Sequence, residues 1–296
     1  MYSALRTRAC YKTIEPAFHL DIEQKGSERV ANDRRDIVAS FDARAATYAA
    51  NVWHQRCAER LVERCRLRAG DRVLDAGTGT GFAALAAARA VGSNGRVHGI
   101  DLSAGMLREA RTAMSTAGVT NVELLEGDAT QLQQFEAGTF DAVTCAAGLL
   151  YMPVADALRE WHRVLKAGGL VAFSTMTAGS PPAARLFRSC AAGFGVALSD
   201  PSEPLGSIDA CRRALGTAGF EGVDVVSDTV EFTAADLALA WESNIRSATH
   251  RDVQRLDPQT LTALQHAYAE AMAREEHQRP SALLQAELLY AMGRRQ

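Results

Sequence analysis

Apolar residues between positions 72 and 176 fall in short runs, which alternate with longer amphipathic or alanine-rich stretches. Short apolar runs predict strands, and the longer stretches predict helices. Strands that alternate with helices are typical of βαβ units, so the pattern predicts an α/β fold with a mostly parallel sheet and helices on both faces. We expect strands over 72–75, 97–101, 122–125, 140–145 and 170–175, and helices over 81–91, 103–117 and 153–165.

The segments on either side of this region are less regular. Residues 33–68 are predicted to be helical and to end before Gly70. Residues 177–206 contain four prolines and several Gly and Ser, which predicts an inserted loop or lid at the edge of the sheet. We also expect helices over 207–218, after the capping box of Thr233 and Asp236 and after Asp257-Pro258, and strands over 222–232 and 283–294.

Composition and charge narrow the class of protein. Hydrophobic residues make up 47% and charged residues 23% of the 296 residues, which is ordinary for a globular protein. The net charge of −3 gives no electrostatic reason to expect a nucleic-acid partner. The six cysteines have no metal-ligand spacing, so we expect free thiols and no bound metal. Without an apolar run suited to a leader or a membrane span, we expect a cytoplasmic protein that does not insert into membranes.

A glycine-rich loop, Gly77-Thr78-Gly79-Thr80-Gly81, follows the first predicted strand and opens a helix. The free amides at such a helix start favour an anion such as a carboxylate. The spacing is GxGxG, whereas dinucleotide folds use GxGxxG. Asp75, two residues before the loop, would repel a pyrophosphate but suits the ammonium of an amino acid. Alternatively, Asp75 could brace the loop or cap the helix.

Two further acids end the next two predicted strands. Asp101 lies twenty residues after Gly81, where an acid accepts hydrogen bonds from two ribose hydroxyls in nucleotide-binding folds. Asp128 follows the third strand and could accept a hydrogen bond from an adenine amino group. A turn-forming role after Gly127 is the alternative for Asp128. Together the loop and the first acid favour an amino acid joined to a ribose.

Six segments resemble class I S-adenosylmethionine-dependent methyltransferases, within the group that includes the ubiquinone/menaquinone-type enzymes. The resemblance is strong over residues 36–176, and its main departure is Ala167, where proline is common. It is specific because the segments occur in the family's order. The six segments are 41–48, 73–81, 99–107, 127–129, 140–143 and 159–169.

The resemblance implies a Rossmann-like seven-stranded sheet of order 3-2-1-4-5-7-6, with strand seven antiparallel, and a helical cap. We expect three parts: residues 1–32 as a tail, an arm or a lid, 33–176 as the cofactor-binding core with cap helices, and 177–296 as a lid insertion with the remaining strands and helices, which shape an acceptor pocket. The implied cofactor is S-adenosylmethionine, with S-adenosylhomocysteine as product, and Tyr48 closes over it while Leu102 and Met106 pack on the adenine. The residues expected to bind it are Tyr48, Asp75, Gly77, Thr78, Gly79, Gly81, Asp101, Leu102, Met106, Asp128, Ala129 and Cys145.

Methyl transfer is an in-line displacement, in which the placing of nucleophile and methyl group supplies much of the rate. A base is needed only where the acceptor must lose a proton. His54 and Tyr151 are the candidate catalytic residues, although a helix-surface histidine and a packing tyrosine are the plainer interpretations. We expect a small-molecule acceptor, such as a secondary metabolite or a quinone-like compound, with an oxygen, nitrogen or carbon nucleophile.

Other functions fit parts of the same pattern. A cyclase or another protein that retains S-adenosylmethionine without transferring its methyl group would carry the same loop. An NAD(P)-dependent oxidoreductase is disfavoured by the glycine spacing and by Asp75. A nucleic-acid methyltransferase is disfavoured because Thr144-Cys145-Ala146-Ala147 replaces the Asn/Asp-Pro-Pro-Tyr motif of amino-methylating DNA enzymes. Either a monomer or a homodimer is compatible with the sequence.

Overall fold

The computed structural model describes residues 34–49 and 52–296. The chain divides into two compact units, Met1–Asp36 and Ile37–Gln296. The arm or lid expected over residues 1–32 lies outside the described residues. The second unit contains every element discussed below, beginning with a helix over residues 37–48 that we call the cap helix.

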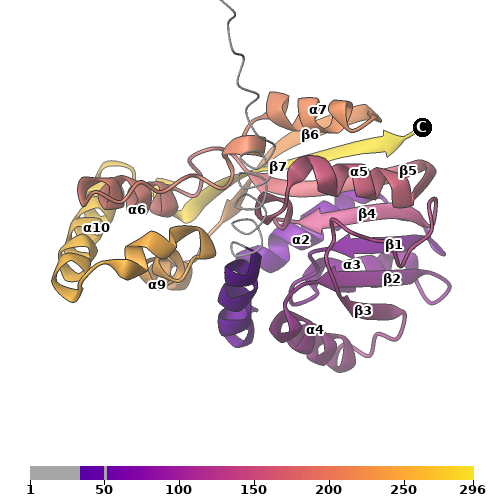
Figure 1. Cartoon of the computed structure of the whole chain (residues 1–296), viewed down its shortest axis with the longest axis horizontal. Coiled ribbons are helices and arrows are strands. Elements are labelled where there is room, and N and C mark those ends of the chain that lie inside the picture. The colour runs from indigo at the N-terminus through magenta and orange to yellow at the C-terminus, as the bar shows by residue number, and fades with distance from the viewer. Residues whose placement is uncertain (1–33, 50–51) are drawn as a thin grey trace, which may run out of the picture. The chain divides into compact units, whose positions relative to one another are not determined.

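Seven strands form one sheet in the second unit, in the order β3-β2-β1-β4-β5-β7-β6 (Figure 1). The β7 strand runs antiparallel to both of its neighbours, and the other pairs are parallel. This confirms the predicted fold class and strand order. The strands are β1 (Arg72–Ala76), β2 (Arg96–Asp101), β3 (Val122–Glu126), β4 (Phe140–Ala146), β5 (Leu165–Met176), β6 (Phe220–Glu231) and β7 (Gln285–Arg295).

Helices cover both faces of the sheet, as predicted. One core contains the buried faces of α2 (Val52–Cys65) and α3 (Phe82–Val91), together with Met114 of α4 (Ala104–Thr116). The opposite core contains Trp161 of α5 (Val154–Val164) and Cys211 of α7 (Ile208–Thr217). The buried face of α3 is mainly alanine, which lets the helix approach the sheet closely.

A helical subdomain lies beyond the ends of β5, β6 and β7 (Figure 1). It has its own apolar core, which includes Phe187, Val253 and Leu264. The subdomain joins the sheet at the edge where the parallel strands end, because β5 and β6 both lead into it and β7 leads out. Its helices are α6 (Pro182–Gly193), α8 (Ala234–Ala238), α9 (Ala240–Ile245), η3 (Ala248–Arg255) and α10 (Pro258–Gln278).

The prediction of an irregular loop over 177–206 is wrong for its central part, which forms α6, and Glu203–Leu205 form the short helix η2, whereas a lid role for the segment stays a prediction. The prolines suggested irregular structure, but Pro182 occupies the first turn of α6, where its missing amide costs no hydrogen bond. The remainder of the segment connects these helices.

Several predicted boundaries also need correction. Helical residues 34–48 and α2 are separate, with 50–51 outside the described residues, and α2 ends at Cys65, before Arg66 at φ 48°. The helix expected over 153–165 ends at Val164, and β5 begins at once, passing through Gly168 at φ 77°. The predicted strand over 283–294 begins later, because Ala282–Leu284 form the short helix η4.

The predicted helix starts are confirmed. Ser103 accepts a hydrogen bond from the Met106 amide, and Thr233 and Asp236 form a reciprocal capping box. Asp257 caps α10, which starts at Pro258. Among the described residues, none of the helices combines the length and the apolar character that crossing a membrane requires.

Candidate functional site

The glycine loop turns sharply between β1 and α3. Gly77, Gly79 and Gly81 all have left-handed φ values, of 69°, 56° and 88°. A Cβ at Gly81 would lie 3.2 Å from the Ala110 Cβ, and the φ of 88° would strain any residue other than glycine there. The amides of Gly77 and Thr78 both donate to the Ile100 carbonyl, at 2.8 and 2.9 Å. These bonds hold the loop against the end of β2.

Asp75 lies buried beneath the loop, with 1% of its surface exposed. Thr78 Oγ1 donates to its Oδ2 (2.7 Å), and Thr144 Oγ1 of β4 donates to its Oδ1 (2.9 Å). The Ala84 amide in the first turn of α3 stabilises the carboxylate further. Burial nonetheless raises the pKa of Asp75 to about 6. The structure therefore gives Asp75 the bracing role, and contact with a ligand ammonium stays a prediction.

Asp101 joins the loop to the next segment along the sheet. Its Oδ2 accepts a hydrogen bond from the Gly79 amide (2.8 Å), and its Oδ1 accepts one from the Ser103 amide (2.9 Å). Burial raises the pKa of this carboxyl group. The Asp101 carbonyl also accepts from the Gly127 amide (2.9 Å), which brings the end of β3 alongside.

The residues predicted to contact adenine lie farther along the same edge. Leu102 is half-buried, whereas Met106 and Ala129 are buried. Asp128 Oδ1 accepts from the amide and the hydroxyl of Thr130, at 2.9 and 2.7 Å, which is a turn-forming arrangement. The ends of β1, β2 and β3 thus present the predicted amino-acid, ribose and adenine contacts in spatial order.

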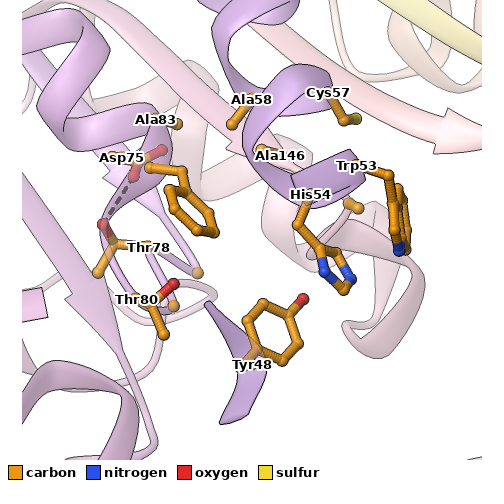
Figure 2. Close-up of a pocket in the computed structure, with 14 residues that line it drawn as sticks. Tyr48, Trp53, His54, Cys57, Ala58, Asp75, Thr78, Thr80, Ala83 and Ala146 are labelled. Carbon is orange, nitrogen blue, oxygen red and sulfur yellow. Dashed lines mark hydrogen bonds between the residues drawn. The ribbon is translucent and has the colours of Figure 1, made fainter. Parts of the chain in front are cut away.

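A pocket lies between the glycine loop and two helices, α2 and the cap helix. Figure 2 shows Tyr48, His54 and Trp53 on the side opposite Asp75 and Thr78. Of the predicted site residues, Tyr48, His54, Asp75, Gly77, Thr78 and Gly79 line this pocket. The other lining residues are Trp53, Cys57, Ala58, Thr80, Phe82, Ala83, Ala146 and Ala147.

Aromatic side chains continue from the pocket wall in both directions. The rings of Tyr48 and His54 stack with 4.2 Å between their centroids. The ring centroids of Trp53 and His54 are 3.8 Å apart. Phe41 of the cap helix contacts both Tyr48 (6.2 Å) and Tyr151 (5.1 Å) edge-on. We call these five residues the aromatic row. It connects the end of β4 to α2 through the cap helix.

His54 is a neutral side chain in this setting. Its Nδ1 is buried and has no hydrogen-bond partner among the residues that the structure describes. Burial, and to a smaller extent the positive charge of Arg44, lowers the pKa of His54 to about 3. Tyr151 lies outside the pocket lining, and burial raises its pKa. Neither group has the pKa of an effective base near neutral pH.

Cys145 and Gly81 also lie outside the pocket lining. Cys145 is completely buried in the core on the α5 side of the sheet, and burial raises its pKa. Its neighbour Thr144 points toward the loop instead, since successive side chains of a strand face opposite ways. A contact between Cys145 and the cofactor stays a prediction.

Thr80 is a pocket residue that the sequence interpretation passed over. Its side chain is buried, and its Oγ1 has no hydrogen-bond partner in the described part of the chain. A buried hydroxyl without a partner is costly, so a ligand group is its natural complement. Its place between Gly79 and Gly81 was the available signal. In residues 34–49 and 52–296, no three His, Cys, Asp or Glu side chains are grouped to hold a metal ion.

Comparison with known proteins gives this site a context. Residues 73–169 match a family described as a methyltransferase domain. An aklanonic acid methyltransferase from a Streptomyces species is 34% identical over 145 residues, which are 48% of this chain and 66% of that protein. A demethylmenaquinone methyltransferase from Geobacillus kaustophilus is 36% identical over 150 residues, which are 50% of this chain and 63% of that protein. The chain thus matches less than two thirds of either relative.

The fold is also found in solved structures. The YcgJ protein from Bacillus subtilis superposes with a TM-score of 0.52 at 18% identity, over 81% of this chain and 99% of that one. This likeness concerns the fold. Residues 73–169 therefore form a methyltransferase domain, in a sheet whose strand order is that of Rossmann-like methyltransferases.

Proposed function

We propose that this protein transfers a methyl group from S-adenosylmethionine to a small molecule. The observation that carries the proposal is the pocket between the glycine loop and the aromatic row, at the edge where the parallel strands end. Open α/β sheets bind their ligands at this edge. Bound S-adenosylmethionine would supply a methyl group on a positively charged sulfur.

The chain's own groups suit such a ligand. Thr80 Oγ1 and the amino end of α3 would hold the carboxylate, and Asp101 would accept from the ribose hydroxyls. Leu102, Met106, Asp128 and Ala129 would surround the adenine. The electron-rich faces of Tyr48 and Trp53 would favour a cationic sulfur nearby. With the cap helix over the pocket, these groups would exclude water from the reacting atoms.

The side chains near the pocket limit which chemical classes of acceptor can be methylated. His54 is too weak a base near neutral pH, and burial raises the pKa values of Tyr48, Tyr151 and Cys57. We therefore favour an acceptor that ionises without help, such as a carboxylic acid or an acidic enol. The names of the two relatives, which refer to aklanonic acid and demethylmenaquinone, support an organic acid or a quinone-like compound.

Residues that approach the acceptor would come from the helical subdomain and the aromatic row. His54 Nδ1, which has no partner among the described residues, would orient the acceptor by a hydrogen bond without removing a proton. The cysteines described in the structure are free, which is consistent with a reducing compartment such as the cytoplasm. A nucleic-acid substrate is not part of this proposal, since the chain carries a small net negative charge.

Calorimetry with S-adenosylhomocysteine, S-adenosylmethionine and NAD(P) tests the cofactor. We expect the first two to bind and NAD(P) not to bind, and the opposite result would favour an oxidoreductase. A screen of polycyclic carboxylic acids, enols and quinols with methyl-labelled S-adenosylmethionine, analysed by mass, then tests transfer. Binding without methylated product from an acceptor that is converted in another way would favour the cofactor-retaining cyclase.

A further inference from the structure

One side chain fastens the cap helix to the amino end of α4. Asp42 Oδ1 accepts hydrogen bonds from Ser103 Oγ (2.6 Å) and from the Gly105 amide (2.8 Å). Ser103 is itself the N-cap of α4, because its Oγ accepts from the Met106 amide (3.0 Å). Free amides and the helix dipole stabilise a carboxylate at this position. Asp42 therefore provides a polar link between two helices that are distant in the sequence.

The steric fit at Gly105 is an independent sign of the same contact. A Cβ at Gly105 would lie 2.8 Å from Asp42 Oδ1, 3.2 Å from Asp42 Cα and 3.3 Å from the Ala45 Cβ. Any larger residue at Gly105 would push the cap helix away. Ala45 is buried at this contact. Small residues on both helices thus allow the close approach that the hydrogen bonds require.

The link continues to the predicted ribose contact. The Ser103 amide donates to Asp101 Oδ1, while the Ser103 hydroxyl donates to Asp42. Asp101 in turn holds the Gly79 amide of the glycine loop. On the far side, Ser40 Oγ of the cap helix donates to the Arg246 carbonyl (3.0 Å), next to the helical subdomain. The cap helix is therefore attached both to α4 and to the residue that follows α9.

We propose that Asp42 is a positioning residue that couples cofactor binding to the placement of the cap helix over the pocket. Through Ser103 it ties the helix that carries Tyr48 to the segment that carries Asp101. A cofactor that orders Asp101 and Ser103 also favours the closed helix, and a closed helix favours the cofactor. The inference rests on the proposed function, because it requires a ribose at Asp101.

Binding of S-adenosylhomocysteine to the full chain tests this coupling. We expect Asp42→Ala to weaken binding about tenfold, because a hydrogen bond to a charged group is lost without a replacement. Asp42→Asn keeps an acceptor oxygen in place and should stay within about threefold of the wild type. Thr47→Ala is the matched control: Thr47 is exposed on the same helix, and within residues 34–49 and 52–296 its hydroxyl bonds only to the Arg44 carbonyl, so affinity should not change.

Hydrogen–deuterium exchange of residues 37–48 separates coupling from a loss of general stability. S-adenosylhomocysteine should slow exchange there in the wild type and in Asp42→Asn, and should have no such effect in Asp42→Ala. Gly105→Ala should behave like Asp42→Ala, although its Asp42 is intact. In a double-mutant cycle, Gly105→Ala should add little to Asp42→Ala, because both disrupt the same contact between the cap helix and α4.

The outcomes distinguish this inference from the proposed function. If the wild type binds S-adenosylhomocysteine, and Asp42→Ala binds it equally well with the same slowing of exchange, the inference is overturned and the proposed function stands. If the wild type does not bind S-adenosylhomocysteine, both are overturned. Equal losses in Asp42→Ala and Asp42→Asn would also contradict the inference, since the retained acceptor oxygen should rescue binding.

Discussion

The glycine loop and the helical subdomain are held together by different interactions. In the loop, Asp75 and Asp101 each accept hydrogen bonds from at least two groups that come from separate segments. In the subdomain, Phe187 is completely buried and contacts Trp241, His250 and Tyr268, with ring centroids 5.6, 5.2 and 5.6 Å away. Directional hydrogen bonds stabilise the glycine loop, and apolar packing stabilises the helical subdomain.

This difference explains why the function of the loop is easier to predict from sequence than the function of the subdomain. A hydrogen-bonded loop needs particular residues at particular spacings, so its sequence identifies its ligand. A packed core accepts several combinations of apolar residues with little loss of stability. The helical subdomain is therefore free to vary with the acceptor, and its sequence carries little information about what binds beside it.

Among these substitutions, Phe187→Ala should cause the largest loss of stability. The loss should be confined to the packing of the helical subdomain. Removing a buried phenyl ring costs about 3–5 kcal/mol of unfolding free energy. The cavity would also face His250, whose Nε2 is buried without a partner among the described residues. We expect urea denaturation to show this loss, while affinity for S-adenosylhomocysteine stays within about twofold. Phe187→Leu should cost much less, and a large loss of affinity in folded Phe187→Ala would show that the two regions are coupled.

Asp75 should give the loop a distinctive pH dependence. Its pKa is raised from 3.8 to about 6, so the folded state retains a proton that the unfolded chain has released. The associated stability is present below about pH 4 and is lost as pH rises through about 6, a change of about 3 kcal/mol. We expect the unfolding free energy of the ligand-free wild type to fall over this pH range, whereas that of Asp75→Asn should not show this fall. Parallel pH profiles for the two proteins would contradict the burial of an ionised Asp75.

Asp101→Ala should impair ligand binding at the glycine loop and leave the helical subdomain intact. The change removes the acceptor for the Gly79 and Ser103 amides and the predicted ribose contact. We expect affinity for S-adenosylhomocysteine to fall about a hundredfold, or about 2.7 kcal/mol. The control is Asp141→Ala, since Asp141 bonds to Lys166 and the Arg72 amide away from the pocket. Equal affinities for Asp101→Ala and wild type would remove Asp101 from the site.

Local and topological features were largely predictable from the sequence. The Ser103 and Thr233 caps depend on neighbouring residues, and the strand order followed from the family resemblance. The hydrogen bond from Thr144 to Asp75 was harder to foresee, because Thr144 lies 69 residues away on β4. The aromatic row likewise joins residues from three separated segments. The α6 helix was missed because Pro182 marks a helix start as readily as a break.

Substitutions of Thr80 and Thr78 test which loop hydroxyl binds the ligand and which one stabilises the fold. Both hydroxyls belong to the same loop, but Thr78 Oγ1 is bonded to Asp75, whereas Thr80 Oγ1 has no partner in the described chain. Thr80→Val should therefore leave stability unchanged or higher and weaken S-adenosylhomocysteine about three- to tenfold, the value of one ordinary hydrogen bond.

Thr78→Val should act mainly on stability, by about 1–3 kcal/mol, because it leaves the buried Asp75 carboxylate short of a donor. Thermal unfolding with and without S-adenosylhomocysteine measures both quantities in one experiment. If Thr80→Val destabilised the ligand-free chain and did not change affinity, its hydroxyl would be structural like that of Thr78. The loop would then hold its ligand through backbone amides alone.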